Sequence, residues 1–283
     1  MSAAALLGLW AAAALAAVGV FGLLIGSFLN VVAYRVPAGL SIVRPRSACP
    51  GCGARIRAWD NVPVMSWLLL RGRCRDCSQP ISWRYPFVEA ATGVLFIVVA
   101  VKFAPAVLGA ADAATTIAAM LQLAAFLYFA GVSVALALID LDTHTLPNAI
   151  VYPSYLVGLV LLTAAALLSG DWSAIATAVI GSAGLFALYL IIALASPRGM
   201  GFGDVKLAGV VGLFLGYLGL GPLLVGAFAA FVLGGLFGVV VRAVRPGGSR
   251  GIAFGPWMFA GAWTGVFFGS VLWQSYLALV VQG

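Results

Sequence analysis

Long apolar segments separated by short polar ones dominate the pattern of this chain. A helix needs about 20 apolar residues to cross a bilayer. Eight segments approach that length, at 5–29, 87–103, 115–139, 149–168, 173–195, 205–220, 222–242 and 253–279, the sixth being short. The runs are continuous rather than alternating, which argues against a β-barrel. The pattern therefore predicts an all-α polytopic membrane protein with about eight transmembrane helices.

Composition supports this fold class. Of the 283 residues, 64% are hydrophobic and only 8% are charged, whereas soluble domains average about 25% charged residues. The first 30 residues contain no Lys or Arg, and their apolar run exceeds the about 7–15 residues of a signal-peptide core. We therefore expect residues 1–34 to form a first membrane helix.

One polar segment, residues 35–85, is much longer than the other loops. Nine of the 15 Lys and Arg lie between Arg35 and Arg84. Basic loops stay on the cytoplasmic side of a membrane, so we interpret the net charge of +7 as a topology signal rather than a nucleic-acid footprint. A cytoplasmic insert also places 140–148, 196–204 and 243–252 on that side, and the last two contain or directly adjoin four arginines: Arg198, Arg242, Arg245 and Arg250.

The insert carries all four cysteines, as Cys49-Pro-Gly-Cys52 and Cys74-Arg-Asp-Cys77. Four thiolates in two such pairs can close a tetrahedral zinc site with no open position, which favours a structural role for the metal. Two disulfides are the alternative, but they require the insert to face an oxidising compartment. The sequence therefore predicts a small cytoplasmic four-Cys zinc-binding insert.

Three of the eight acidic residues stand near the predicted cytoplasmic ends of helices: Asp140, Asp142 and Asp204. Acids at membrane depth are costly and commonly functional. Two carboxylates that share a site titrate as a unit, which can supply a base for water and an acid for a leaving amine. Asp140 and Asp142 lie about 200° apart around a helix, so only one can face Asp204, and geometry alone does not choose between them.

Other roles for these acids remain open. Asp204 can pair with Lys206, and Asp142 with His144, the only histidine. A non-enzymatic transporter or assembly scaffold, with acids that couple to protons or pair structurally, is consistent with the same residues.

Taken in order, the motifs resemble those of the bacterial type IV prepilin peptidases, also called leader peptidase/N-methyltransferases. The resemblance covers nearly the whole chain and rests on four segments: Gly26–Pro37, the four-Cys insert, Ile139-Asp140-Leu-Asp-Thr-His-Thr-Leu-Pro147-Asn148 and Gly199-Met-Gly-Phe-Gly203-Asp204-Val-Lys206. One departure is Ala253-Phe-Gly-Pro256, where the family usually has proline in place of alanine. Because it lies outside the acid motifs, we expect it to have no effect on the acids.

The resemblance implies a Gly-x-Gly-Asp aspartic endopeptidase of the bacterial inner membrane. Such enzymes cleave the leader of type IV prepilins or pseudopilins after a glycine, on the cytoplasmic side, and serve type IV pili or type II secretion. The catalytic residues match Asp140 and Asp204, and the zinc ligands match Cys49, Cys52, Cys74 and Cys77.

Members with the cysteine insert also methylate the new N-terminal residue with S-adenosylmethionine. Gly72 and Glu89 fall in segments associated with that step. We therefore expect a methyltransferase-associated zinc insert at 35–85 and an aspartic peptidase bundle at 86–283, with peptidase activity alone as the alternative. Expected partners are the substrates and the lipid bilayer, and no nucleic acid.

Overall fold

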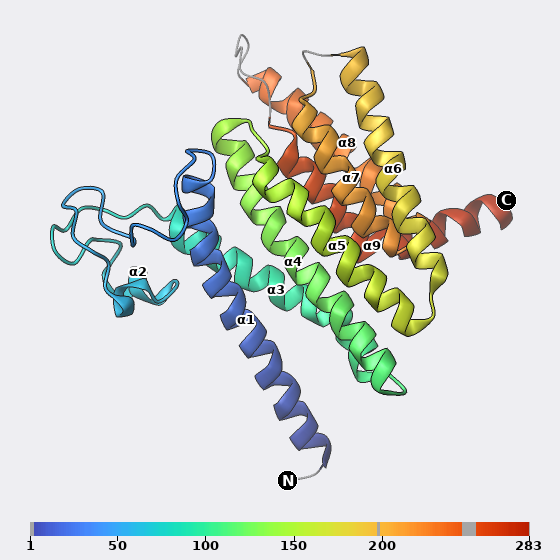
Figure 1. The fold of residues 1–283 in the computed structure, drawn as a ribbon, viewed down its shortest axis with the longest axis horizontal. Helices are drawn as coiled ribbons and strands as arrows, with labels where there is room; N and C mark the ends of the chain where they lie inside the picture. The colour runs from blue at the N-terminus through green and yellow to red at the C-terminus, as the bar shows by residue number, and fades with distance from the viewer. Residues whose placement is uncertain (1–2, 197–198, 245–252, 283) are drawn as a thin grey trace. The chain divides into compact units, whose positions relative to one another are not determined.

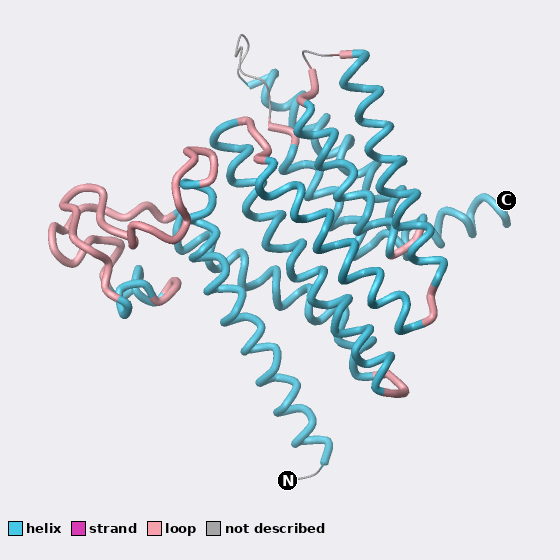
Figure 2. Tube along the Cα trace, in the orientation of Figure 1, coloured by secondary structure: helices cyan, strands magenta, loops and turns pink. Residues whose placement is uncertain are grey.

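The computed structural model of the chain describes residues 3–196, 199–244 and 253–282. Over these residues the regular structure is helical, with no β-strand (Figure 2). The chain divides into two compact units, Met1–Pro105 and Ala106–Gly283. The predicted all-α fold class is confirmed.

The first unit contains α1 (Ala3–Arg35), a 3-10 turn η1 (Ala58–Asn61), α2 (Met65–Leu69) and most of α3 (Arg84–Leu108) (Figure 1). Gly22 and Gly26 of α1 pack against the backbone of α3, because a Cβ added to them would lie 2.9 Å from the Cα of Gly93 and 2.7 Å from that of Glu89. Small residues allow such close helix packing in membranes. The predicted insert is the loop-rich region between these two helices.

The second unit is a helical bundle. It contains α4 (Ala113–Thr143), α5 (Asn148–Ser169), α6 (Trp172–Ala195), α7 (Phe202–Tyr217), α8 (Leu220–Val244) and α9 (Gly255–Gln282). The carboxylates of Asp112 and Asp171 accept backbone N–H groups in the first turns of α4 and α6. Both acids are therefore helix N-caps.

Helix α7 differs from its neighbours because it is short and enclosed. Its 16 residues span about 24 Å, less than the about 30 Å hydrocarbon core of a bilayer. It contacts α5, α6, α8 and α9, and its residues 207–216 are all buried. A helix that is apolar on every face is stable when other helices surround it.

Glycines bring the helices of the second unit close together. A Cβ on Gly181 of α6 would lie 2.5 Å from the carbonyl oxygen of Gly212 in α7. In the same way, Gly265 and Gly269 of α9 lie against Pro222 of α8. The bundle is therefore held by close backbone packing of the kind that drives helix association in lipid.

Among the described residues, seven helices are long and apolar enough to cross a membrane, and the sixth predicted range forms the shorter α7. Arg242 lies in the last turn of α8, whereas Arg198, Arg245 and Arg250 lie outside the described residues. The orientation of the helices and the division at residues 34 and 85 stay predictions.

Candidate active site and cysteine cluster

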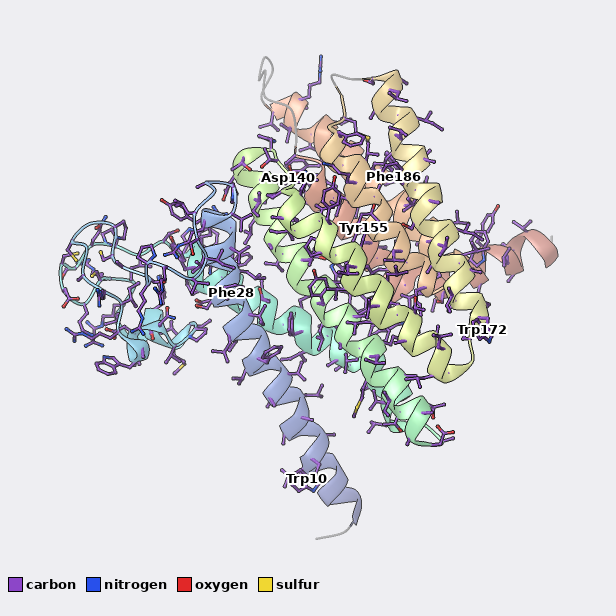
Figure 3. All side chains as sticks on the ribbon, in the orientation of Figure 1. Trp10, Phe28, Asp140, Tyr155, Trp172 and Phe186 are labelled. Carbon is purple, nitrogen blue, oxygen red and sulfur yellow. The ribbon has the colours of Figure 1, made fainter. Side chains whose placement is uncertain are left out.

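Asp140 lies in the last turn of α4 and is 4% exposed (Figure 3). Its Oδ2 accepts a hydrogen bond of 2.8 Å from the backbone N–H of Gly255, the first residue of α9. The first N–H groups of a helix have no partner within that helix. The carboxylate therefore satisfies a backbone donor, and this donor fixes the carboxylate.

Asp204 lies in the first turn of α7 and is half-buried. Its Oδ2 accepts a hydrogen bond of 3.1 Å from the N–H of Gly201, the N-cap residue. This is the reverse contact of a capping box, in which the third helical residue reaches back to the cap. The second acid is therefore also held by a backbone amide at a helix N-terminus.

The two acid motifs lie against each other. A Cβ on Gly203 would be 3.2 Å from the Cβ of Leu146, which precedes the proline of the first motif. The Lys206 Nζ donates a hydrogen bond of 2.6 Å to the Oδ1 of Asn148. Asp140 and Asp204 are close enough for their charges to interact. The second unit therefore brings together the two carboxylates that the sequence singled out.

Tyr189 is a further residue near this pair, and sequence reasoning gave no sign of it. It belongs to α6, is 2% exposed and lies in the neighbourhood of Asp204. Its ring lies 5.2 Å from that of Phe231 and 6.3 Å from that of Phe254, measured between centroids. Phe254 directly precedes Gly255, so this aromatic group packs beside the amide that binds Asp140.

Gly255 makes a contact that the sequence analysis did not anticipate. Its N–H binds one of the acids, and a Cβ at this position would lie 2.8 Å from Oδ2 of Asp140. The contact joins residues 115 positions apart. The motif's similarity to the family is the one sequence signal that could have suggested such a role.

The remaining candidates lie elsewhere. Asp142 and His144 are exposed, and His144 ends α4 with a left-handed backbone (φ 53°). Lys206 does not pair with Asp204 in the described region; beyond its bond to Asn148, it lies over the rings of Tyr152 and Phe202. Of the two acids in the first motif, only Asp140 is buried.

The four cysteines form a compact cluster in the first unit. Their Sγ atoms, from Cys49, Cys52, Cys74 and Cys77, all lie within 4.8 Å of one another. The Sγ atoms of Cys49 and Cys77 are 3.7 Å apart. A tetrahedral ion with metal–sulfur distances of about 2.3 Å separates its ligands by about 3.8 Å. The donor set and its spacing therefore fit a four-thiolate metal site.

Two similar turns present these sulfurs. The Cys49 N–H donates to Ala54 and the Cys74 N–H donates to Gln79, each at 2.9 Å. The residue four positions after each cysteine, Gly53 or Ser78, has a positive φ. The backbone N–H groups of Cys52 and Gly51 face the Cys49 sulfur and lower the pKa of that thiol to about 7. Such a thiol is readily deprotonated, as metal ligation requires.

The disulfide alternative is not supported by this geometry. All four cysteines are free, and the 3.7 Å between two of the sulfurs is far longer than the about 2.05 Å of a disulfide. The acids of the insert have other roles: Asp60 pairs with Arg75, and Asp76 pairs with Arg57.

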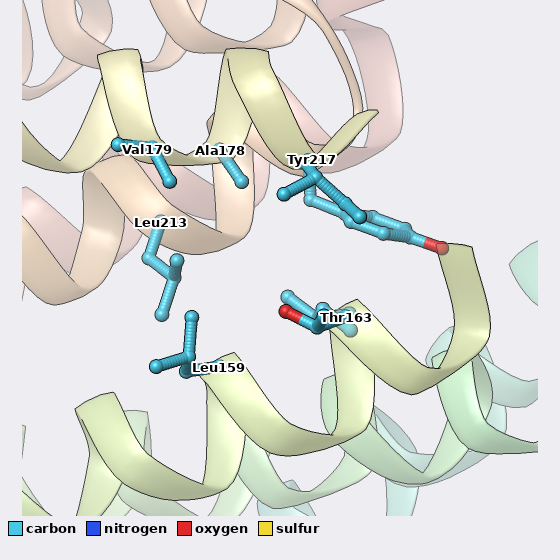
Figure 4. Close-up of a pocket in the computed structure, with 8 residues that line it drawn as sticks. Leu159, Thr163, Ala178, Val179, Leu213 and Tyr217 are labelled. Carbon is cyan, nitrogen blue, oxygen red and sulfur yellow. The ribbon is translucent and has the colours of Figure 1, made fainter. Parts of the chain in front are cut away.

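A small cavity in the second unit lies between α5, α6 and α7 (Figure 4). Its volume is about 10 Å³, and Leu159, Ala178, Leu213 and other mainly apolar side chains line it. This is room for about one water molecule. It includes neither acid and is too small for a substrate.

Two family models match this chain. Residues 20–103 match the family model "Bacterial Peptidase A24 N-terminal domain", and residues 126–239 match "Type IV leader peptidase family". The first match contains the cysteine cluster and the second contains both acids. No solved structure matches the chain.

Similar proteins are named "Prepilin leader peptidase/N-methyltransferase". One from Pseudomonas putida is 36% identical, and the match covers 92% of this chain and 93% of that protein. One from Neisseria gonorrhoeae is 35% identical over 86% of this chain and 87% of its own. One from Aeromonas hydrophila is 36% identical over 91% of both. Since the identity extends across both units, the chain belongs to the type IV prepilin leader peptidase/N-methyltransferase family, within the A24 peptidases.

Proposed function

We propose that this protein cleaves the leader peptide of type IV prepilins or pseudopilins with Asp140 and Asp204, and then methylates the new N-terminus. The observation that carries the proposal is that the two acid motifs lie against each other, with each acid bound by a backbone amide. The names of the similar proteins supply the reaction.

Cleavage proceeds by general acid–base chemistry. One carboxylate takes a proton from a water molecule, whose oxygen attacks the carbonyl carbon of the glycine that ends the leader. The partner acid, carrying the shared proton, donates it to the amide nitrogen as the C–N bond breaks. Like charges in one site cannot both ionise cheaply, so one proton stays with the pair.

Both acids lie at helix termini. Asp140 is in the last turn of α4, and Asp204 is in the first turn of α7. A prepilin has a basic leader followed by an apolar helix, so its cleavage point falls at a membrane boundary. The basic insert favours the cytoplasmic side of a bacterial inner membrane for this end of the bundle. Cleavage at the membrane boundary requires the catalytic acids to lie at the depth of that boundary.

The cysteine cluster is proposed to hold a structural zinc ion with Cys49, Cys52, Cys74 and Cys77. Zinc suits four thiolates in tetrahedral geometry, and the four ligands leave no position for water. The ion therefore stabilises the insert. S-adenosylmethionine would supply an electrophilic methyl group: the new N-terminal amine would form a bond to that carbon and lose a proton to solvent, and S-adenosylhomocysteine would leave.

The proposal is tested with a co-expressed prepilin analysed by mass spectrometry. Wild type is expected to remove the leader and add the mass of one methyl group. Asp140→Asn and Asp204→Asn are expected to leave the leader attached, while Asp142→Asn, an exposed acid two positions away, keeps cleavage.

The possible outcomes of this experiment distinguish the hypotheses. Cleavage by either Asn variant contradicts the assignment of the acids. Leader loss without methylation by wild type supports the peptidase-only alternative. No processing by any form, with normal membrane insertion, favours a non-enzymatic transporter or scaffold.

A further inference from the structure

A second cavity, of about 430 Å³, opens in the first unit between the end of α1 and the basic insert. Its volume falls in the about 300–1,000 Å³ range of ligand-binding clefts. Its walls come from α1, from the loop at 42–47 and from residues 56–63. Neither the two acids nor the four cysteines are among the described residues that line it.

The α1 wall of the cavity is apolar. Leu24, Phe28 and Val31 line it and recur at the spacing of one helix face. Phe28 projects from the part of α1 that leads to the insert (Figure 3). The membrane-crossing part of α1 runs from Gly8 to Arg35, so this wall lies near one end of that span. It offers a hydrocarbon chain a surface continuous with the bilayer interior.

The far end of the same wall is basic. Arg35 follows Val31 by one helical turn, and its guanidinium donates to the carbonyl oxygens of Ser41 and Pro45, each at 2.8 Å. These two bonds hold the loop that carries Arg46 over the cavity. Within the described ranges, Arg46 has no hydrogen bond or ion pair to the protein, so its donors are available to a ligand.

The described lining of the cavity contains arginines and no acidic residue. Asp60 and Asp76 of the insert are already paired with Arg75 and Arg57. The buried Glu89 carboxylate accepts the N–H of Val64, next to the lining residue Pro63. A planar guanidinium binds phosphate well, so an anionic headgroup matches this end of the cavity.

Exposed apolar side chains stand at the rim of the cavity, beside its arginines. Ile42 and Val43 line the cavity and are 40% and 74% exposed. Two exposed aliphatic residues next to arginines suit the interface between headgroups and acyl chains, where apolar and basic groups act together.

We propose that this cavity binds an anionic phospholipid from the leaflet on the insert's side, independently of the role of the acids. The phosphate contacts Arg46, and one acyl chain follows Leu24, Phe28 and Val31. A free phosphate leaves the apolar wall uncovered. S-adenosylmethionine carries two cationic groups against one carboxylate, which does not match a site with arginines and no acid. The bound lipid ties the insert to the end of α1.

The test is native mass spectrometry of the purified full-length protein with added ligands. Wild type is expected to retain phosphatidylglycerol about tenfold better than phosphatidylcholine with the same acyl chains, because the positive charge of choline offsets the attraction of the phosphate to the arginines. Arg46→Gln is expected to abolish that preference. Arg44→Gln, two positions away in the same loop and outside the cavity lining, is the matched control and keeps it.

A second variant changes a residue on a different wall of the cavity. Ala58→Trp fills the cavity without changing its charge and is expected to reduce binding of both lipids, so a folding defect in one variant does not decide the question. The proposal is overturned by equal retention of the two lipids by wild type, or by an equal loss in Arg44→Gln and Arg46→Gln. It is also overturned if glycerol 3-phosphate or S-adenosylmethionine displaces phosphatidylglycerol completely.

Discussion

A single methyl group at Gly255 is expected to disable the peptidase while leaving the fold intact. The alanine Cβ in Gly255→Ala would stand 2.8 Å from Oδ2 and 3.3 Å from Cγ of Asp140. Gly255 has no positive φ and is the first residue of α9. Alanine is the better helix former there, so the backbone itself does not resist the change.

The size of the effect follows from the contact. Ordinary van der Waals contact starts at 3.4 Å, so the carboxylate must move by about 0.6 Å or turn away from the amide. A displacement of about 1 Å in a reacting group can cost about 100-fold in rate. We therefore expect kcat to fall by about 10- to 100-fold, with little change in KM.

The assay is the steady-state cleavage of a purified prepilin by enzyme in detergent, with thermal unfolding of each variant measured alongside. Gly235→Ala in α8 and Gly184→Ala in α6 are the matched controls, because a Cβ at either position meets nothing within 4 Å. Both controls are expected to match wild type in rate, and all three variants to match it in Tm.

Two results would refute this reasoning. A Gly255→Ala enzyme within about twofold of the wild-type rate would mean that the position of Asp140 is not critical. Equal losses in the controls would mean that added bulk in any helix impairs the bundle.

Two further predictions concern a cysteine of the metal cluster and the hydrogen bond between Lys206 and Asn148 near the acids. Cys74→Ser is expected to lose bound zinc, measured by elemental analysis, and to expose the insert to proteolysis; a fully retained metal ion would contradict the four-thiolate site. Lys206→Met is expected to lower kcat about fivefold, because its partly exposed bond to Asn148 contributes about 1 kcal/mol. Adding Asn148→Ala should then cost nothing more, and an additive loss in this double-mutant cycle would show that the two residues act separately.

The helices could be predicted from sequence because the property that defines them is local. Apolar runs bounded by turn residues correspond to α1, α3, α4, α5, α6, α8 and α9. For α7 the hydropathy signal gave an approximate range, 205–220, but it did not indicate that other helices surround this helix. Hydropathy does not distinguish a helix that faces lipid from one surrounded by other helices.

The cysteine cluster was predictable because ligand spacing is itself a sequence feature. Each pair needs only a short turn, and the sequence supplies glycine at 53 for one of them. The second turn places Ser78 in the left-handed region instead (φ 59°), which composition does not suggest. Hydrogen bonds from the turns' own backbone hold this less favourable conformation.

The supports of the acids could not be predicted, because their partners are backbone groups of remote helix ends. Asp140 and Asp204 are bound by the N–H groups of Gly255 and Gly201, which lie at the N-termini of α9 and α7. Any residue except proline has a backbone N–H, so no particular residue type in the sequence indicates either contact.

This choice of partner has a chemical consequence. Burying a carboxylate is costly, and helix N-termini offset part of that cost through aligned amide dipoles. A Lys or Arg would do so as well, but an ion pair would hold one carboxylate permanently charged and hinder proton exchange with water. Lys206 stands two residues from Asp204 yet bonds to Asn148. The two acids are therefore bound by groups that do not give up a proton, which in the proposed mechanism leaves proton transfer to the two carboxylates and the attacking water molecule.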